Sequence, residues 1–389
     1  MKKLKMGMIG GGPGSLIGAV HRLAAERDGY IELVAGVFSQ DFEKTKKLGE
    51  ELGIDPSRLY PDYIAMFKEE LYKPEGERLD IISIVTPNHL HFEQAKLALE
   101  SKFHVVCDKP LTVTHQQAAE LERISKEFRK EFAVTYTYTG YPMVKEARAM
   151  VQNGELGEVR KVMVEYVQGW LSKEIESEGH KQASWRTDPS KSGKVGALGD
   201  IGVHAFNLVE YVCDTKVEEV CTELNTTIAS RSLEDDNNSF IHLDNGAKGT
   251  LISSQVCIGE ENNLSMRIYG DKASLEWRQM ESEKLIIRYS DRPMKVLKAG
   301  TDQLSEIAQQ NVRLPGGHPE GFNEAFANIY RNFAKTLITK RNGKQPTQVD
   351  LDFPKAEDGV RGMLFIEKAL ESNASGQKWV SLKQPELIN

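Results

Sequence analysis

Residues 105–112 read Val-Val-Cys-Asp-Lys-Pro-Leu-Thr, and the first three have the length and β-branched character of a buried parallel strand. The strand must end before Pro110, because proline cannot donate a hydrogen bond to a neighbouring strand. Lys109 is therefore placed at the carboxyl end of a strand, and ligands of open parallel α/β sheets bind in the crevice outside those ends. Most single lysines are solvated surface charges. The function of Lys109 depends on what else the chain brings to that edge.

The composition indicates an ordinary soluble globular protein of two domains. The chain has 389 residues, which is long for one hydrophobic core, and 40% of them are hydrophobic and 28% charged. A net charge of -7 argues against nucleic acid or an anionic membrane as a partner, since either requires a basic surface, and favours a small-molecule ligand. The 4 cysteines lack C-x-x-C spacing, so we expect reduced thiols in a cytoplasmic protein and propose no metal site. We find neither a secretory signal nor an apolar run long enough to span a membrane.

The N-terminal region has the order of elements of a dinucleotide-binding unit. A strand is predicted at Leu4–Ile9, followed by the turn Gly-Gly-Gly-Pro-Gly-Ser-Leu-Ile-Gly at residues 10–18 and a helix over about Ala19–Arg27. In this context the backbone N–H groups of a glycine turn bind a pyrophosphate at the positive end of the helix.

The spacing of the glycines in this turn is imperfect. Gly10 and Gly12 match the first two glycines of G-x-G-x-x-G, whereas the third position falls on Ser15. Gly18 takes that position only if the loop is longer than usual. A glycine-rich turn by itself fits a phosphate cradle and a plain tight turn about equally.

The second strand, at about Ile31–Phe38, ends at the position that distinguishes NAD from NADP. NAD-preferring enzymes usually place an acidic residue there against the ribose 2′-hydroxyl. Ser39 removes the repulsion that an acid would exert on a 2′-phosphate, and Lys44 would attract that phosphate. Asp41 would instead bind a ribose hydroxyl, or serve only as the N-cap of a helix at Phe42–Leu52. The cofactor is therefore predicted as NAD or NADP, without a preference.

Strands and helices continue to alternate up to about residue 137. The strand Asp80–Val85 is apolar on both faces, as a parallel strand covered by helices should be, and residues 86–91, Thr-Pro-Asn-His-Leu-His, follow at its carboxyl end. The last strand is predicted at Phe132–Thr137. We expect six strands in a doubly wound parallel sheet, so that residues 1–137 form a Rossmann domain of the α/β class.

Residues 138–389 are predicted as a second domain of the α+β class. Its β-rich runs are joined by short turns, as in a large, mostly antiparallel sheet, and lie at 160–168, 217–228, 239–243, 249–256, 264–269, 273–277 and 285–289. Helices are predicted near 143–153, 319–340 and 354–372. One face of this sheet is left without helices, so we expect a homodimer or homotetramer formed through it. The acidic run Glu234-Asp235-Asp236 is interpreted as a solvated turn.

One helical turn in the second domain carries a candidate pair of functional residues. Asp200 and His204 are four residues apart, so they lie on one helical face and can address the same ligand atom. An isolated D-x-x-x-H is more often an acid at a helix start and a packed histidine. However, Gly196, Gly199 and Gly202 crowd this turn, and each glycine costs a helix about 0.5–1 kcal/mol relative to alanine. This cost suggests that the backbone approaches something closely.

Three segments make the chain resemble the Gfo/Idh/MocA family of nicotinamide-dependent sugar and cyclitol oxidoreductases over nearly its whole length. Asp108-Lys109-Pro110 stands where the family usually shows Glu-Lys-Pro, and Gly-Asp-Ile-Gly-Val-His at residues 199–204 stands at its second signature. Thr86-Pro87-Asn88 resembles the loop on the nicotinamide side. Residues 185–189 and 317–321 resemble the subgroup of inositol and levoglucosan dehydrogenases.

The resemblance implies the oxidation of a secondary alcohol of a cyclitol, sugar or anhydro-sugar. His204 is the favoured base for the hydroxyl proton, Lys109 would stabilise the alkoxide, and Asp200 would orient the substrate or His204. Lys109 as the base is the alternative. Cofactor contacts are assigned to Gly10, Gly12, Ser15, Gly18, Ser39, Asp41, Lys44, Thr86, Pro87, Asn88, His91, Asp108 and Lys109. Substrate contacts are assigned to Lys109, Tyr138, Tyr141, Trp185, Arg186, Asp200, His204 and His318, since a sugar offers hydroxyl groups and C–H faces.

The sequence is also compatible with two other functions. A glycosidase of the same family oxidises its sugar only transiently, with bound NAD, so that the glycosidic bond can be eliminated. A regulator on the same fold binds the nucleotide without catalysis. The presence of Lys109, Asp200 and His204 argues against the regulator, because a binding module needs no proton relay.

Overall fold

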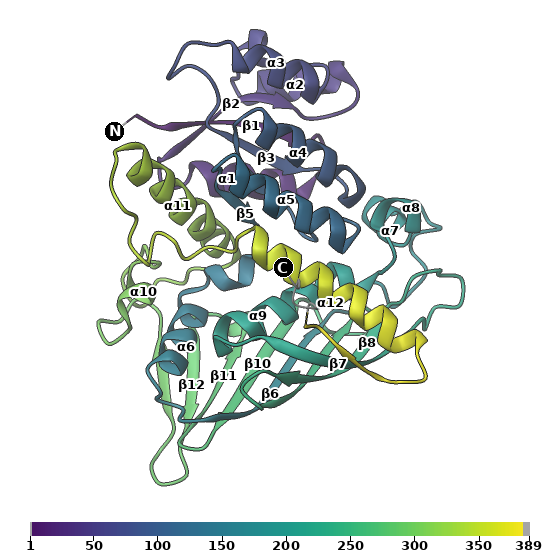
Figure 1. Ribbon diagram of the computed structural model, residues 1–389, viewed down its shortest axis with the longest axis vertical. Coiled ribbons are helices and arrows are strands. Elements are labelled where there is room, and N and C mark those ends of the chain that lie inside the picture. The colour runs from purple at the N-terminus through teal and green to yellow at the C-terminus, as the bar shows by residue number, and fades with distance from the viewer. Residues whose placement is uncertain (1, 384–389) are drawn as a thin grey trace, which may run out of the picture. The chain divides into compact units, whose positions relative to one another are not determined.

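The computed structural model describes residues 2–383, which divide into two units (Figure 1). Within the described residues, the first unit comprises 2–140 and 322–360, and the second comprises 141–321 and 361–383. The boundary predicted after residue 137 lies close to the first crossing between them. Nothing in the sequence pattern indicates that a later segment returns to the first unit.

The first unit contains a parallel sheet of five strands, where we expect six. The strands are β1 (Leu4–Gly10), β2 (Ile31–Val37), β3 (Ile81–Val85), β4 (His104–Cys107) and β5 (Phe132–Val134). Only five stretches of residues 1–137 have the length and apolar character of a strand. The prediction of a sixth strand is therefore wrong. The Rossmann class is correct, and every neighbouring pair of strands is parallel.

The strand order β2-β1-β3-β4-β5 determines where a ligand can lie. The order reverses between β1 and β3, and in doubly wound sheets ligands bind at such a switch point, outside the carboxyl ends of the strands. The glycine turn follows β1 and residues 86–91 follow β3. Both predicted cofactor loops therefore flank the switch point.

The helices of the first unit include one from far along the chain. They are α1 (Leu16–Glu26), α2 (Phe42–Glu51), α3 (Tyr63–Leu71), α4 (His91–Glu100), α5 (His115–Glu127) and α11 (Phe322–Arg341). Helix α11 packs against α1, and its buried Phe326, Tyr330 and Phe333 join one core with Met6 and Met8 of β1. The core of this Rossmann unit is thus completed by a helix that follows residues 141–321 of the second unit in sequence.

The second unit is built on a mixed sheet of nine strands. They are β6 (Val159–Val167), β7 (Val217–Asn225), β8 (Asp236–Leu243), β9 (Lys248–Ser254), β10 (Asn263–Gly270), β11 (Ser274–Arg278), β12 (Lys284–Arg288), β13 (Lys295–Lys298) and β14 (Trp379–Ser381). Their order is β13-β12-β11-β10-β6-β9-β8-β7-β14, and only β6 and β9 pair in parallel. The predicted antiparallel character is therefore correct apart from this central pair, whereas β13 and β14 are not anticipated.

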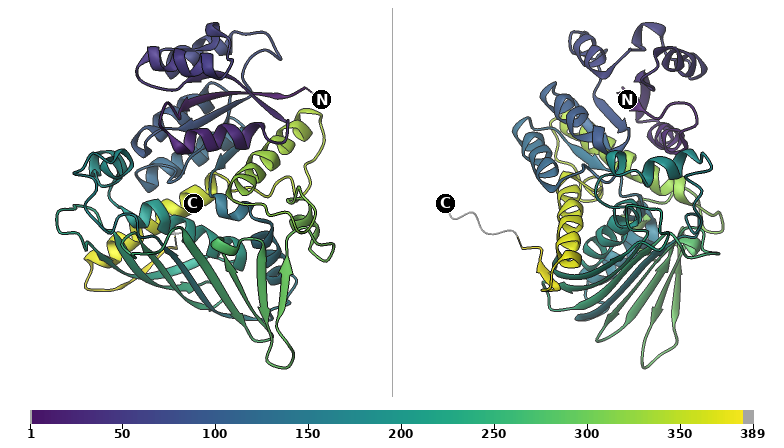
Figure 2. Two further views of the ribbon diagram at one scale, coloured as in Figure 1. Left: turned by 180° about the vertical axis from the view of Figure 1, so that it is seen from behind. Right: turned by 90° about the vertical axis from the view of Figure 1, so that its right-hand side faces the viewer.

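The second unit contains several helices, three of which cover one face of its sheet. The helices are α6 (Pro142–Gln152), α7 (Lys181–Arg186), α8 (Pro189–Ser192), α9 (Val203–Cys213), α10 (Glu306–Gln309) and most of α12 (Ala356–Ala374). Figures 1 and 2 show α6, α9 and α12 along one face, and no helix of this unit covers the other face in the described residues. Across residues 2–383, no helix is both long and apolar enough to cross a bilayer.

Candidate active site

The predicted cofactor residues of the first unit gather at one edge of its sheet. Each lies at the carboxyl end of a strand, in the loop after it or in the first turn of the next helix: Gly10, Gly12, Ser15 and Gly18 at β1, Ser39, Asp41 and Lys44 at β2, Thr86, Pro87, Asn88 and His91 at β3, and Asp108 and Lys109 at β4. Carboxyl ends of parallel strands share one edge. This edge therefore carries the complete set of candidate cofactor contacts.

The turn between β1 and α1 has the close approaches that a pyrophosphate cradle requires. Gly10 and Gly11 adopt φ of 84° and 68°, which favours glycine. A Cβ on Gly18 would lie 2.4 Å from the Gly11 Cα, so Gly18 provides the close packing expected of the third glycine. Ser15 is the N-cap of α1 and accepts from Gly18 N at 3.2 Å. The residues present thus fit a dinucleotide phosphate at the α1 N-terminus.

The residues after β2 form a compact polar turn. Asp41 is the N-cap of α2, where its carboxylate accepts from Glu43 N at 3.1 Å and lies 3.5 Å from Lys44 Nζ. Ser39 Oγ accepts from Asp41 N at 3.1 Å, and Ser39 N donates to Thr45 Oγ1 at 3.0 Å. Asp41 therefore has the capping role that the sequence allows.

His91 connects two loops of the sheet edge through its ring. Its Nε2 lies 2.8 Å from the Thr86 carbonyl oxygen and its Nδ1 lies 3.1 Å from the Pro110 carbonyl oxygen. The side chain is buried, and burial lowers the pKa of His91. The ring lies between the loop after β3 and the turn that carries Lys109, and in its neutral form its single N–H donates to one of these two carbonyl oxygens.

Asp108 and the half-buried Lys109 rest on a buried polar network. The Asp108 carboxylate accepts from Thr135 Oγ1 at 2.7 Å and from Lys109 N at 2.9 Å, and lies 3.9 Å from His21 Nε2. His21 Nδ1 lies 2.7 Å from the hydroxyl of Tyr330. Burial by itself would raise the pKa of Asp108, but the His21 ring, the Lys109 charge and the Thr135 hydroxyl hold it well below its ordinary value. Asp108 is therefore a carboxylate that anchors the lysine turn.

In the second unit, the Asp200 carboxylate connects its own turn to the end of a short helix and to the end of a strand. Its Oδ2 accepts from Arg186 Nε at 3.0 Å and from Gln255 Nε2 at 2.8 Å. Arg186 ends the short helix α7, and Gln255 directly follows β9. The structure thus brings together the predicted Arg186 and Asp200, and adds Gln255, which the sequence analysis misses.

Two indole rings flank the Arg186 guanidinium. Its carbon lies 4.3 Å from the ring centroid of Trp185 and 5.8 Å from that of Trp170. The Trp170 Nε1 donates to Gln168 Oε1 at 2.9 Å, and Gln255 Nε2 lies 3.3 Å from the same oxygen. Aromatic faces beside amide and guanidinium donors have the chemistry that binds a sugar or cyclitol ring.

His204 follows Asp200 by one turn and lies in the first turn of α9. Residues Leu198–Gly202 form a π-helical turn, a feature often found at functional sites, and α9 begins at Val203. The His204 side chain is buried, with its ring centroid 6.2 Å from that of Tyr166. His204 therefore lies one helical turn after Asp200 and beside Tyr166 of β6.

The glycines of this turn approach protein atoms. A Cβ on Gly196 would lie 2.3 Å from the Glu234 carbonyl oxygen, and one on Gly202 would lie 2.8 Å from Ser253 Oγ. On Gly199 it would lie 2.7 Å from a methyl carbon of Val195. The predicted close approach exists, and its partners are neighbouring segments of the same unit.

The acidic run at residues 234–236 is not the solvated turn that we expect. Glu234 and Asp235 are buried, with exposed fractions of 8% and 2%. The Asp235 carboxylate accepts from Thr227 N at 2.8 Å and from Arg231 Nη1 at 3.2 Å. A run of acidic residues is usually exposed to solvent, and the sequence does not show which groups would pair with it. Here backbone amides and a buried guanidinium satisfy the buried carboxylates.

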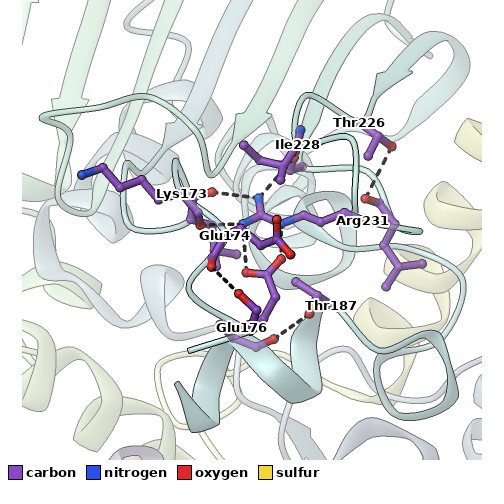
Figure 3. A network of polar contacts seen from close by, with 12 residues as sticks. Lys173, Glu174, Glu176, Thr187, Thr226, Ile228 and Arg231 are labelled. Carbon is purple, nitrogen blue, oxygen red and sulfur yellow. Dashed lines mark hydrogen bonds and ion pairs between the residues drawn. The ribbon is translucent and has the colours of Figure 1, made fainter. Parts of the chain in front are cut away.

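Arg231 holds the loop that precedes α7 (Figure 3). Its Nη1 donates to the Leu171 carbonyl at 2.7 Å, its Nη2 donates to the Lys173 carbonyl at 2.9 Å, and its Nε donates to Glu176 Oε1 at 2.7 Å. A guanidinium has enough donors to make all of these bonds at once. The segment between β6 and α7, which includes Trp170, is thereby attached to residues 226–235.

The remaining predicted substrate residues have other surroundings. Tyr138 and Tyr141 are buried, and the Tyr141 ring centroid lies 5.4 Å from that of Trp277. His318 lies in an exposed loop, where its Nδ1 is 3.2 Å from the Pro315 carbonyl oxygen.

The same two units are found in known proteins. Residues 4–136 match the family described as "Oxidoreductase family, NAD-binding Rossmann fold", and residues 144–276 match "GFO/IDH/MocA C-terminal domain". An uncharacterized oxidoreductase of Bacillus subtilis, YfiI, is 34% identical over 98% of both chains. The chain belongs to the Gfo/Idh/MocA oxidoreductase family.

Solved structures of this Gfo/Idh/MocA family show the same architecture. An inositol dehydrogenase homolog from Azotobacter vinelandii complexed with NAD+ is 35% identical, with a TM-score of 0.92 over 98% of this chain and 97% of that one. The same homolog complexed with NADH and myo-inositol is 34% identical, with a TM-score of 0.90 over 98% of both chains. Levoglucosan dehydrogenase in complex with NADH and levoglucosan, at 22% identity and a TM-score of 0.83, shares the fold.

These comparisons confirm the fold class, the family resemblance and a nicotinamide dinucleotide as the cofactor of this Gfo/Idh/MocA oxidoreductase. Its Gln168, Trp170 and Gln255 are the polar and aromatic residues that sequence reasoning misses. Gln168 and Gln255 follow the parallel pair β6 and β9, so their ends meet at one place. The strands are separated by two others in the chain, and no local pattern indicates that they pair.

Proposed function

We propose that this protein is a dehydrogenase that transfers a hydride from a secondary alcohol of a cyclitol, sugar or anhydro-sugar to NAD or NADP. The observation that carries the proposal is the inositol dehydrogenase homolog of Azotobacter vinelandii, which is 34% identical over 98% of both chains and was solved with NADH and myo-inositol. The donor set of the second unit supports it, since Arg186, Gln168 and Trp170 suit a neutral polyol.

The first unit would hold the cofactor at its sheet edge. The turn from Gly10 to Gly18 would bind the pyrophosphate, and Ser39 and Asp41 would face the adenosine ribose. The loop beginning at Thr86 and the turn at Lys109 would lie on the nicotinamide side. When bound, the nicotinamide ring supplies the hydride acceptor.

The protein's own residues would control the proton and the developing charge. An imidazole nitrogen of His204 accepts the hydroxyl proton, because imidazole titrates near neutral pH. Lys109 Nζ donates a hydrogen bond to the reacting oxygen and stabilises its negative charge. Asp200, held by Arg186 and Gln255, orients the substrate or His204. The alcohol carbon loses a hydride and its hydroxyl loses a proton, which gives a ketone.

A panel of polyols tests this function through net cofactor reduction. We expect myo-inositol or a related cyclitol or pyranose to produce NADH or NADPH, measured by absorbance at 340 nm with each cofactor in turn. Cleavage of a glycoside without net reduction would instead identify a transient oxidant. Tight cofactor binding without turnover of any polyol or glycoside would identify a nucleotide-binding regulator. Either of these results would contradict the proposal.

We also propose that the protein is a homodimer or homotetramer formed through the open face of the nine-stranded sheet. One row across that face pairs Trp379 with Cys221, Cys221 with Phe240, and Phe240 with Thr250. Phe240 and Trp379 are 58% and 37% exposed, which is unusual for side chains of this size. Light scattering is expected to report two or four chains. A Phe240→Glu variant should dissociate, and a monomeric wild-type protein would contradict this assignment.

A further inference from the structure

Glu234 holds the backbone at the beginning of the turn that carries Asp200 and His204. Its two carboxylate oxygens each lie 2.8 Å from Gly196 N, and Oε1 also lies 2.8 Å from Leu198 N. Between these, Ala197 N donates to the Glu234 carbonyl oxygen at 3.1 Å. Three consecutive backbone amides are therefore bound by one residue, and that residue is buried.

These amides need a partner that the helical turn cannot provide. The first N–H groups of a helix have no acceptor inside it, and they carry the positive end of its dipole. A carboxylate satisfies both conditions. Gly196 lacks a Cβ at the place where one would lie 2.3 Å from the Glu234 carbonyl oxygen, so the chain is built to approach Glu234 this closely.

We call the hydrogen bonds between Glu234 and the three amides of residues 196–198 the clamp. One further hydrogen bond connects the clamp to the candidate catalytic residues. Asp200 N donates to the Gly196 carbonyl at 2.9 Å, and His204 follows one turn later. Gly199 and Gly202 give this turn little resistance of its own to bending. A shift of the backbone at Gly196 would therefore be passed on to Asp200 and His204.

We infer that Glu234 is a positioning residue for the alcohol oxidation proposed above, on which this inference rests. Its carboxylate fixes the π-helical turn and thereby the orientation of Asp200 and His204 toward the reacting hydroxyl. It acts through backbone amides and has no contact with the reacting atoms.

The charge of Glu234 depends on pH in the neutral range. Burial, and to a smaller extent the neighbouring Asp235, raises the pKa of Glu234 to about 7 against the lowering effect of its amide hydrogen bonds. Asp235 is paired with Arg231, which also binds Glu176. On the turn itself, Asp200 is charged and is paired with Arg186, and Lys194 precedes Gly196 by two residues. The clamp is thus fully charged only above neutral pH.

A Glu234→Gln variant tests the inference, with Asp236→Asn as the matched control on the same segment. We measure kcat and KM of the full-length protein at pH 6 and pH 8.5, and backbone hydrogen exchange of residues 196–204. At pH 8.5, kcat of Glu234→Gln should fall by roughly 10-fold to 100-fold, which is the scale of a misplaced catalytic group. The KM for the cofactor should stay within about twofold of wild type. At pH 6, where wild-type Glu234 is largely protonated, the difference should shrink, and Asp236→Asn should behave as wild type.

Hydrogen exchange separates this inference from the proposed function. Faster exchange at residues 196–198 in Glu234→Gln supports the clamp, even if no polyol is oxidised by the wild-type protein and the proposed function fails. Unchanged exchange with unchanged kcat overturns the inference. An equal loss of kcat at both pH values, with a raised cofactor KM and faster exchange throughout the chain, also overturns it, because that pattern describes general destabilisation.

Discussion

Lys109 and His204 are the two residues that we expect to contribute to the chemical step more than to the binding of ligands. Lys109 is the second residue after β4 and follows the anchored Asp108, while His204 lies in the first turn of α9. In the proposed reaction each acts more strongly on the transition state than on the bound alcohol. Removing either side chain should therefore affect turnover more than ligand affinity.

We expect Lys109→Ala and His204→Ala each to lower kcat by about 10²-fold to 10⁴-fold, the usual contribution of a positioned proton-transfer or charge-stabilising group. The dissociation constant of NADH, measured by fluorescence titration, should stay close to that of wild type. The exposed Lys344→Ala serves as the control for a lost surface charge. Turnover like that of wild type in either variant would contradict the role assigned to that residue.

The raised pKa of Glu234 predicts how stability depends on pH. The folded protein binds this proton up to about pH 7, whereas an unfolded glutamate releases it near its ordinary pKa of 4.5. Stability from this group is therefore fully present below about pH 4.5 and is lost as pH rises through about 7. Relative to Glu234→Gln, the wild-type free energy of unfolding should fall by about 2–3 kcal/mol between pH 5 and pH 8. Urea unfolding at both pH values measures this difference. An equal change in the free energy of unfolding between pH 5 and pH 8 for the two proteins would refute the prediction.

At the scale of elements, the junction of β1 and α1 depends on two glycines in contact. Gly18 lies in the first turn of α1, and Arg22, one turn later, donates to the Gly11 carbonyl at 2.8 Å. Helix and turn thus hold each other in the conformation that presents backbone N–H groups to a phosphate. Any side chain at position 18 would separate them.

Gly18→Ala places a Cβ 2.4 Å from the Gly11 Cα and 2.6 Å from the Gly11 carbonyl oxygen. Overpacking of this kind typically costs about 1–3 kcal/mol, and here it also displaces the turn. We expect NADH affinity to fall by at least about tenfold and the melting temperature to decrease, as measured by fluorescence titration and calorimetry. Gly376→Ala is the control, since a Cβ there meets no atom within 4 Å. Unaltered NADH binding by Gly18→Ala would show that the turn tolerates the displacement.

At the scale of the whole molecule, the first unit is made of two separate stretches of chain. A Cβ on Gly140 would lie 2.0 Å from the Ala325 carbonyl oxygen, and Asn328 Nδ2 donates to the Gly140 carbonyl at 2.8 Å. The end of the first stretch is therefore adjacent to the beginning of α11. Residues 141–321 of the second unit are inserted between two points of the first unit that are already neighbours.

We expect residues 1–140 alone not to fold cooperatively, and residues 1–140 joined to 322–360 by a short Gly/Ser linker to fold and bind NADH. Loss of α11 removes the buried Phe326, Tyr330 and Phe333 from the core. At about 1.5–3 kcal/mol for each side chain, this loss is comparable with the whole stability of a domain. Circular dichroism during urea unfolding distinguishes the two chains, and a cooperative transition of residues 1–140 alone would show that α11 is dispensable.

The fold and the outline of the site could be predicted because their signals are local. The strand that ends before Lys109, the turn from Gly10 to Gly18 and the four-residue spacing of Asp200 and His204 are each read within a few positions. The supporting contacts could not be predicted in this way. Gly196 and Glu234 are 38 positions apart, and Ser83 lies 2.9 Å from the Tyr330 hydroxyl across 247 positions.

The sequence alone therefore determined a Rossmann domain with a nicotinamide dinucleotide turn, a lysine at the adjacent strand end and an Asp-His turn in a second, β-rich domain. These features follow from periodicity, chain order and residue type. Only the tertiary structure decided that α11 completes the first core, that β6 pairs in parallel with β9, and that the buried Glu234 clamps the Asp-His turn. Each of these features depends on hydrogen bonds and packing between segments that are distant in the sequence. Such contacts stabilise the protein only after folding has brought the segments together.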